Sequence, residues 1–93
     1  MLYERALASD PTFTPSVRNI ARARYDLADY EGAVENYRRA VELSPSDDDL
    51  RTDLAWALLN ASRFQEAREV CNEVLAHDSR NAAAQAILAR LPN

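Results

Sequence analysis

Along most of this chain apolar residues recur at every third or fourth position, and no segment alternates apolar with polar residues. The first spacing is typical of one buried face of an α-helix, whereas alternation indicates a β-strand. The pattern therefore predicts an all-α protein. The apolar positions expected to face inward form five groups: Val17, Ile20, Ala21 and Leu27; Ala33, Tyr37 and Ala40 with Val34 and Val41; Leu50, Leu54, Ala55 and Leu58; Ala67, Cys71 and Val74; and Ala84, Ile87, Leu88 and Leu91.

Polar residues mark where these helices should begin and end. Thr14, with a proline after it, favours a helix start, because Thr caps through its hydroxyl and proline tolerates the first turn. Asp29 and Ser62 are the predicted N-caps of the helices that follow them. Asp47–Asp49 place negative charge at a helix N-terminus, where the helix dipole favours it. Pro45 ends a helix, because the residue before a proline avoids helical geometry.

A nine-residue sequence motif recurs at a fixed interval along the chain. YERALASDP at Tyr3–Pro11 reappears as YRRAVELSP at Tyr37–Pro45, 34 residues later, and more weakly as CNEVLAHDS at Cys71–Ser79. Such a period indicates stacked units of two helices each. We therefore expect a single domain over residues 1–93, with two full units and two partial ones at 14–47, 48–81, 1–13 and 82–93.

The repeated residues resemble the tetratricopeptide repeat (TPR), in which small residues lie where paired helices touch, an aromatic follows and proline ends the unit. The resemblance covers essentially the whole chain. It implies a right-handed superhelix, an α-solenoid, of antiparallel helix pairs with about six helices. Arg51 and Cys71 depart from the pattern, standing where the family prefers aromatic residues. The matching positions are Ala21, Ala33, Tyr37, Ala40 and Pro45; Leu54, Ala55 and Ala67; and Tyr3, Ala6, Leu7 and Pro11.

The two ends of the chain are expected to be half-hairpins. Residues 1–9 correspond to a second helix without its first, and the last helix to a first helix without its second. Either the chain is a segment of a longer array, which we favour, or the ends complete each other between copies. The apolar residues expected to face nothing are Leu2, Tyr3 and Leu7 at one end and Ile87, Leu88 and Leu91 at the other.

Composition and charge narrow the functional classes. The chain is 47% hydrophobic and 28% charged, with no apolar run long enough to span a membrane, so we expect a soluble protein, cytoplasmic by default. Its formal net charge of −4 argues against binding nucleic acid, which requires a basic surface. All eleven basic residues are arginine, which we interpret as coding bias, with a bacterial origin as hypothesis.

Groups capable of catalysis are sparse. His77 is the single histidine, and its position near a helix C-terminus suits the helix dipole. Cys71 falls on an inward stripe, where a small core residue is the simpler interpretation. No cluster has metal-ligand spacing, and no glycine-rich loop could hold a phosphate. We therefore expect no enzyme, no cofactor and no metal.

A binding surface has more support. The resemblance implies that the first helix of each unit lines a concave groove for a peptide or partner helix. Independently of the family, Trp56 shares a helical face with Thr52, Leu59 and Asn60, away from the core stripe, and either anchors a partner or completes the core. The predicted groove residues are Arg18, Asn19, Arg22, Tyr25, Asp49, Asp53, Trp56, Leu59 and Asn60, with Pro15, Asp26 and Thr52 beside them.

The charges of this groove are mixed. Some TPR domains grip the C-terminal carboxylate of heat-shock chaperones, and Arg18 matches one basic position, but Arg22 and Asp53 stand where such clamps carry Asn. We expect instead a ligand that is apolar in the middle and oppositely charged at its ends, unless the groove charges merely pair with each other. The main hypothesis is a non-catalytic protein-interaction scaffold. The alternative is a structural segment that self-assembles through its terminal half-hairpins.

Overall fold

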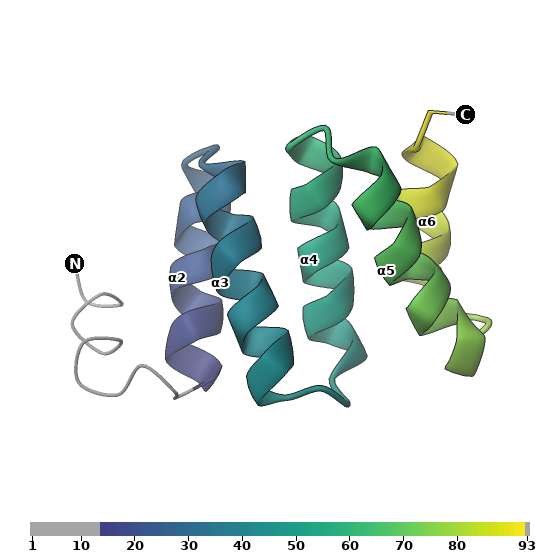
Figure 1. Ribbon diagram of the computed structural model, residues 1–93, viewed down its shortest axis with the longest axis horizontal. Helices are drawn as coiled ribbons and strands as arrows, with labels where there is room; N and C mark the ends of the chain where they lie inside the picture. Colours follow the sequence, from purple (N-terminus) through teal and green to yellow (C-terminus); the bar gives the residue numbers. More distant parts are fainter. Residues whose placement is uncertain (1–13, 93) are drawn as a thin grey trace.

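The computed structural model describes residues 14–92, and these residues contain helices and no strand. Figure 1 shows each helix running antiparallel to the next along the chain. This arrangement confirms the predicted all-α solenoid of antiparallel helix pairs. The helices are α2 (Thr14–Asp26), α3 (Tyr30–Leu43), α4 (Asp48–Asn60), α5 (Phe64–His77) and α6 (Ala82–Arg90).

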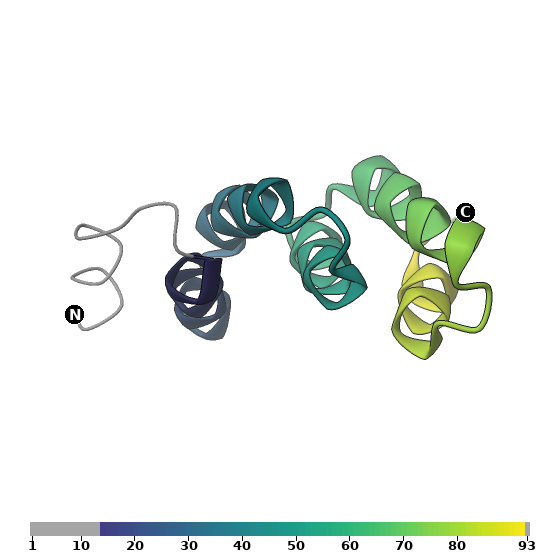
Figure 2. The same cartoon turned by 90° about the horizontal axis from the view of Figure 1, so that it is seen from below.

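The helices form two layers that bow into an arc. In Figure 2, α3 and α5 lie along the outer side of the arc, and α2, α4 and α6 along the inner side. The Cα atoms span 40 Å along the array but only 17 Å through it, a thickness that suits two helix layers whose axes are about 8–10 Å apart. The first helix of each hairpin therefore lines the inner, concave face.

Side-chain caps begin three of the helices. The carboxylate of Asp29 accepts from the backbone N–H of Gly32 at 3.0 Å, as predicted for the start of α3. Asp47 accepts in the same way from Asp49 and Leu50, and Asn81 begins α6 by accepting from the N–H of Ala84. Each cap satisfies backbone donors that the helix leaves unpaired.

The predicted cap at Ser62 was wrong. The N-cap of α5 is Arg63, which makes no side-chain cap hydrogen bond, and Ser62 instead closes the helix before it. Ser62 has a φ of 63°, and the N–H of Arg63 donates to the carbonyl of Leu58 at 2.9 Å. A left-handed residue followed by this long-range bond is a Schellman C-cap, so the backbone geometry of the turn takes precedence over the hydroxyl.

The same turn occurs 34 residues earlier. Ala28 has a φ of 62°, and the N–H of Asp29 donates to the carbonyl of Arg24 at 2.8 Å. The α2–α3 and α4–α5 hairpins are therefore closed by equivalent left-handed turns. Both use a residue with a Cβ, although glycine enters this region without steric cost.

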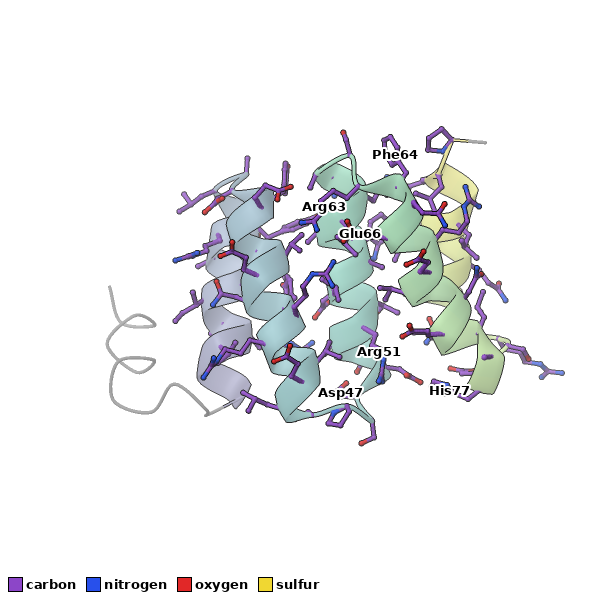
Figure 3. All side chains as sticks on the ribbon, in the orientation of Figure 1. Asp47, Arg51, Arg63, Phe64, Glu66 and His77 are labelled. Atoms are coloured by element: carbon purple, nitrogen blue, oxygen red, sulfur yellow. The ribbon has the colours of Figure 1, made fainter. Side chains whose placement is uncertain are left out.

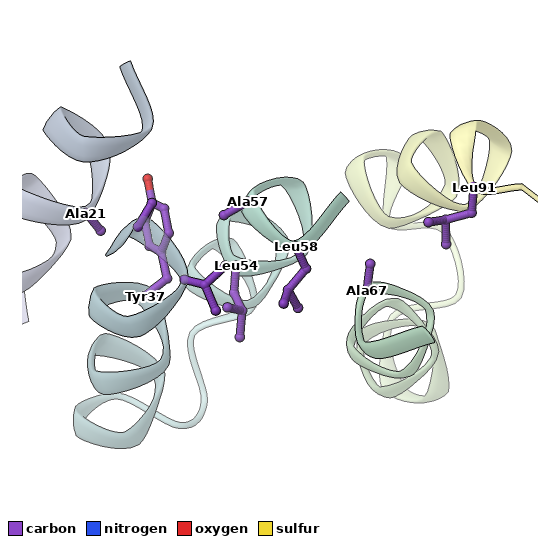
Figure 4. Close-up of a cluster of buried hydrophobic side chains, with 9 residues drawn as sticks. Ala21, Tyr37, Leu54, Ala57, Leu58, Ala67 and Leu91 are labelled. Carbon is purple, nitrogen blue, oxygen red and sulfur yellow. The ribbon is translucent and has the colours of Figure 1, made fainter. Parts of the chain in front are cut away.

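Small side chains let the helices approach closely. Ala21, Ala33, Ala55 and Ala67 are fully buried at or beside the helix crossings, as the pattern predicted. Figure 4 shows the largest cluster running from Ala21 on α2 to Leu91 at the end of α6. Two smaller clusters adjoin this one, through the partly buried Val41 and Leu59, so apolar contacts continue along the array and hold the concave helices in register.

Apolar positions at the two ends of the described array lie elsewhere than expected. Leu27 was assigned to the inner face of α2 but is 74% exposed, because α2 ends at Asp26 and the left-handed turn follows. At the other end, Ile87, Leu88 and Leu91 were expected to face nothing. Ile87 and Leu91 are buried and Leu88 is half-buried, because α6 packs against α5 and α4. The corresponding expectation for Leu2, Tyr3 and Leu7 lies outside the described residues.

Candidate functional site

A cleft of about 300 Å³ lies on the concave face between α2, α3 and α4. Four of its lining residues belong to the predicted groove, and the fifth, Tyr37, comes from α3. Three are aromatic, and the other two carry opposite charges. The lining residues are Arg22, Tyr25, Tyr37, Asp53 and Trp56.

Hydrogen bonds within the groove fix one aromatic wall of the cleft. The side-chain amide of Asn60 donates to the hydroxyl oxygen of Tyr25 at 3.0 Å and to the carbonyl of Trp56 at 2.8 Å. The ring of Tyr25 also meets the ring of Tyr30 edge-on, with centroids 5.4 Å apart. Asn60 thus joins α4 to α2, and Tyr25 is held in place without any ligand.

Trp56 belongs both to the core and to the groove. Its half-buried ring packs against the cluster formed by α4, α5 and α6, and the guanidinium of Arg90 lies 5.3 Å from its ring centroid. An arginine at this distance over a ring makes a cation–π contact. The two alternatives for Trp56 are therefore combined, because the ring completes the core and also lines the cleft.

The charges of the cleft are partly paired. Nη2 of Arg18 donates to Oδ2 of Asp53 at 3.0 Å, which joins α2 to α4, and Arg22 pairs with Asp26 at 3.2 Å on α2. Burial raises the pKa of Asp53, and the nearby Asp49 raises it further, although Arg18 and Arg22 act in the opposite direction. The attraction of Arg18 and Arg22 therefore does not fully offset the cost of removing the charged Asp53 carboxylate from water.

Tyr37 has an unusual position in the cleft. Only 3% of its surface is exposed, yet it lines the cleft, and its hydroxyl has no hydrogen-bond partner among the described residues. Burial, reinforced by the charge of Asp53, raises its pKa to about 12, so the phenol stays protonated at neutral pH. The apolar pattern predicts Tyr37 as a core residue only. The sequence does offer one signal of a further role. Phenylalanine would pack in the core as well as tyrosine, and a buried tyrosine hydroxyl usually has a hydrogen-bond partner.

A family model described as tetratricopeptide repeat matches residues 25–91. This chain belongs to the TPR family. Among solved structures, the NMR structure of the second TPR domain of human RPAP3, in complex with the HSP70 peptide SGPTIEEVD, has a TM-score of 0.85 and 24% sequence identity. The match covers 95% of this chain and 73% of that one, and at this identity it concerns the fold. No curated protein matches the sequence.

The remaining predicted groove residues of this TPR chain are spread along α2 and α4. Asn19 and Asp49 are exposed, and Leu59 is half-buried against two core clusters. Thr52 was placed on the groove face but is 6% exposed, and its hydroxyl donates to the carbonyl of Asp49 at 3.0 Å. A hydroxyl that bonds to its own helix can be buried at little cost, which explains this correction. The side chain of Pro15 lies outside the described residues.

Other reactive groups in the TPR chain lie away from the cleft. Cys71 is fully buried, and burial raises the pKa of its thiol to about 11, so it is not a thiolate at neutral pH. His77 contacts the carboxylate of Asp48, with Nε2 at 2.7 Å from Oδ1. Over residues 14–92 no group of three or more His, Cys, Asp or Glu could hold a metal ion. Within the same range no helix has the length and apolarity needed to cross a membrane.

Ion pairs on the outer side of the TPR array tie the two hairpins together. Glu66 on α5 pairs with Arg38 on α3 and with its neighbour Arg63, which also lies 3.2 Å from Glu31. Figure 3 shows Arg63 and Glu66 side by side near the start of α5, and Arg51 and His77 at the opposite end of the second hairpin. There Arg51, in place of the aromatic residue, lies 3.7 Å from Asp48 and 3.9 Å from Glu73.

Proposed function

We propose that this TPR chain is a non-catalytic protein-interaction module that holds a peptide or a partner helix in its concave groove. The hairpins α2–α3 and α4–α5 form its two repeat units, over residues 14–47 and 48–81. Tyr25, Trp56 and Leu59 anchor the ligand, and Arg18, Asn19, Arg22, Asp49, Asp53 and Asn60 set its register and specificity.

The observation that carries this proposal is the cleft of about 300 Å³ with aromatic walls on the concave face. Trp and Tyr are enriched among the side chains that contribute most binding energy at protein interfaces, and a side chain that is already held in place loses little conformational freedom when a partner covers it. Tyr25 and Trp56 are in addition held by Asn60 and by Arg90. The site is therefore pre-organised.

The RPAP3 domain supports the general mode of binding, since it shares the fold and is seen in complex with a peptide. Its peptide, SGPTIEEVD, is rich in acidic residues towards its end. The groove of this chain instead carries Asp49 and Asp53, and Arg18 is already paired with Asp53. A ligand of different charge is therefore expected here.

A peptide-display selection tests the proposal. Peptides enriched on the wild-type domain should bind Trp56→Ala at least about 10–30-fold more weakly, as expected for the loss of a hot-spot anchor. Phe64→Ala is the matched control, because Phe64 is also an exposed aromatic residue but lies on α5, outside the cleft. Circular dichroism verifies that both variants are folded. Selected peptides that bind Trp56→Ala as tightly as the wild type would refute the groove.

Self-assembly is the weaker candidate, because Ile87 and Leu91 are buried within the chain and are not available to a second copy. Sedimentation velocity from micromolar to hundreds of micromolar concentrations distinguishes the two functions. A constant monomer mass is expected. A mass that grows with concentration, and that Leu88→Asp reduces, would restore the alternative.

A further inference from the structure

Building on the proposed function, we propose that the aromatic cleft is a pocket for an arginine side chain of the partner peptide. The guanidinium would lie against the rings of Tyr25 and Trp56 and pair with the carboxylate of Asp53. This assignment gives the central pocket of the groove a cationic ligand, the opposite of a carboxylate clamp.

The chemistry of the lining is the first argument. Three aromatic rings, one carboxylate and the guanidinium of Arg22 line the cleft, and Arg22 is paired with Asp26. Aromatic faces attract cations, and a planar guanidinium can stack on a ring while its N–H groups bond a carboxylate. A volume of about 300 Å³ leaves room for such a side chain.

The carboxylate retains a free acceptor. Arg18 donates to Oδ2 of Asp53, whereas Oδ1 accepts no hydrogen bond among the described residues. No buried side-chain oxygen in this part of the chain lacks a partner, so Oδ1 must be reached by solvent. The hydroxyl of Tyr37 is unpartnered and solvent-reached for the same reason, although Tyr37 is otherwise 97% buried. Both oxygens can accept an N–H from an incoming guanidinium.

Two arginines of the chain itself already make the two kinds of contact proposed for the ligand, an ion pair with Asp53 and a cation–π contact with Trp56. Arg18 pairs with Asp53 at 3.0 Å, and the guanidinium of Arg90 lies 5.3 Å from the ring centroid of Trp56. Each is an internal arginine that makes one of the two contacts that the ligand would combine.

The surrounding charge also favours a cation. Asp49 lies one helical turn before Asp53, and no ion pair is found for it over residues 14–92. Like charges one turn apart repel each other, and burial with this neighbour leaves the pKa of Asp53 raised. Arg22 at the rim opposes an incoming cation, but its charge is offset by Asp26 at 3.2 Å. The charge of Arg18 is already paired with Asp53 itself.

The test uses a small probe. Nα-acetyl-arginine amide is titrated into the folded domain, and the indole N–H resonance of Trp56, the single tryptophan, is followed by NMR. We expect a saturable shift with a dissociation constant of about 1–10 mM, and about fivefold weaker binding of the neutral isostere Nα-acetyl-citrulline amide. Asp53→Asn should weaken the arginine probe by a similar factor. Glu69→Gln removes the same charge from α5, outside the cleft, and should leave binding unchanged.

Arg22→Gln provides a second, opposite prediction. Removing this rim cation should strengthen the arginine probe about two- to threefold, whereas it would weaken any acidic ligand. Equal shifts with arginine and citrulline, or weaker arginine binding in Arg22→Gln, would overturn the assignment. If selected peptides need Trp56 but contain no functionally required arginine, the arginine pocket is wrong and the groove remains. If no peptide needs Trp56, the groove itself is wrong.

Discussion

Ala28→Gly and Ser62→Gly should each stabilise the protein, although substitutions to glycine usually do the reverse. Both residues occupy the left-handed region, with φ of 62° and 63°, and each closes a hairpin through a Schellman turn. In that region the Cβ of an L-residue lies too close to the following carbonyl oxygen. Glycine has no Cβ and adopts the same backbone without this repulsion.

The expected gain follows from two opposing terms. Relief of the left-handed conformation is worth about 1–2 kcal/mol per residue, and the extra freedom of glycine in the unfolded chain costs about 0.5–1 kcal/mol. Each substitution should therefore raise the free energy of unfolding by about 0.5–1 kcal/mol. Because the two turns share no hydrogen-bond partner, their gains should add, so the double variant should be about 1–2 kcal/mol more stable and its Tm about 4–16 °C higher.

Urea unfolding followed by far-UV circular dichroism measures these changes. Ala86→Gly is the control, because Ala86 is an exposed residue inside α6 with ordinary helical backbone, and glycine there should cost about 1 kcal/mol. The two turn variants and the control should thus move in opposite directions. A loss of stability in Ala28→Gly and Ser62→Gly similar to that in Ala86→Gly would refute the left-handed turns.

Three other substitutions or measurements test the core and the cleft. Ala67→Leu should overpack the α4–α5 crossing and lower the free energy of unfolding by about 1–3 kcal/mol in urea, whereas Ala76→Leu on the exposed side of α5 should change it little. Burial raises the pKa of Asp53, so the folded state binds the carboxyl proton more tightly than the unfolded state does. Ionisation of this carboxyl therefore lowers the free energy of unfolding as the pH rises through its pKa. Asp53→Asn should therefore gain stability relative to the wild type between about pH 3 and pH 7 in parallel thermal melts, and a constant difference would contradict this account. Cys71 should react with a disulfide reagent only at the rate of unfolding, and stoichiometric labelling of the native protein would contradict its burial and its pKa of about 11.

The helical fold could be predicted because local and repeated signals agree. The stripe from Leu50 to Leu58 and the cap at Asp29 appear in the structure as the pattern predicted. The errors at Ser62 and Leu27 fall within the two hairpin turns, where α4 and α2 end. At these positions a left-handed turn sets the backbone conformation, and the sequence has no glycine there to indicate it. The packing of α6 was also missed, because periodicity shows an apolar face but not which surface covers it.

The candidate site was harder to predict than the fold. The face carrying Arg22, Tyr25, Asp53 and Trp56 follows from helix geometry and the family resemblance, and these four residues meet at the cleft. Tyr37 contributes to the cleft through its hydroxyl, whereas its ring is buried in the core. The pairings of Arg18 and Arg90 depend on how neighbouring helices are spaced, which a helical stripe does not encode.

The measurement that tests the central claim most directly is a map of the backbone amide shifts caused by a peptide selected on the wild-type domain. Our account predicts that the largest shifts fall on α2 and α4, around Tyr25, Asp53 and Trp56. The outer residues Arg38 and Glu66 should remain unchanged. Shifts concentrated on the outer faces of α3 and α5, with the cleft unperturbed, would contradict the concave groove as the binding site of this TPR domain.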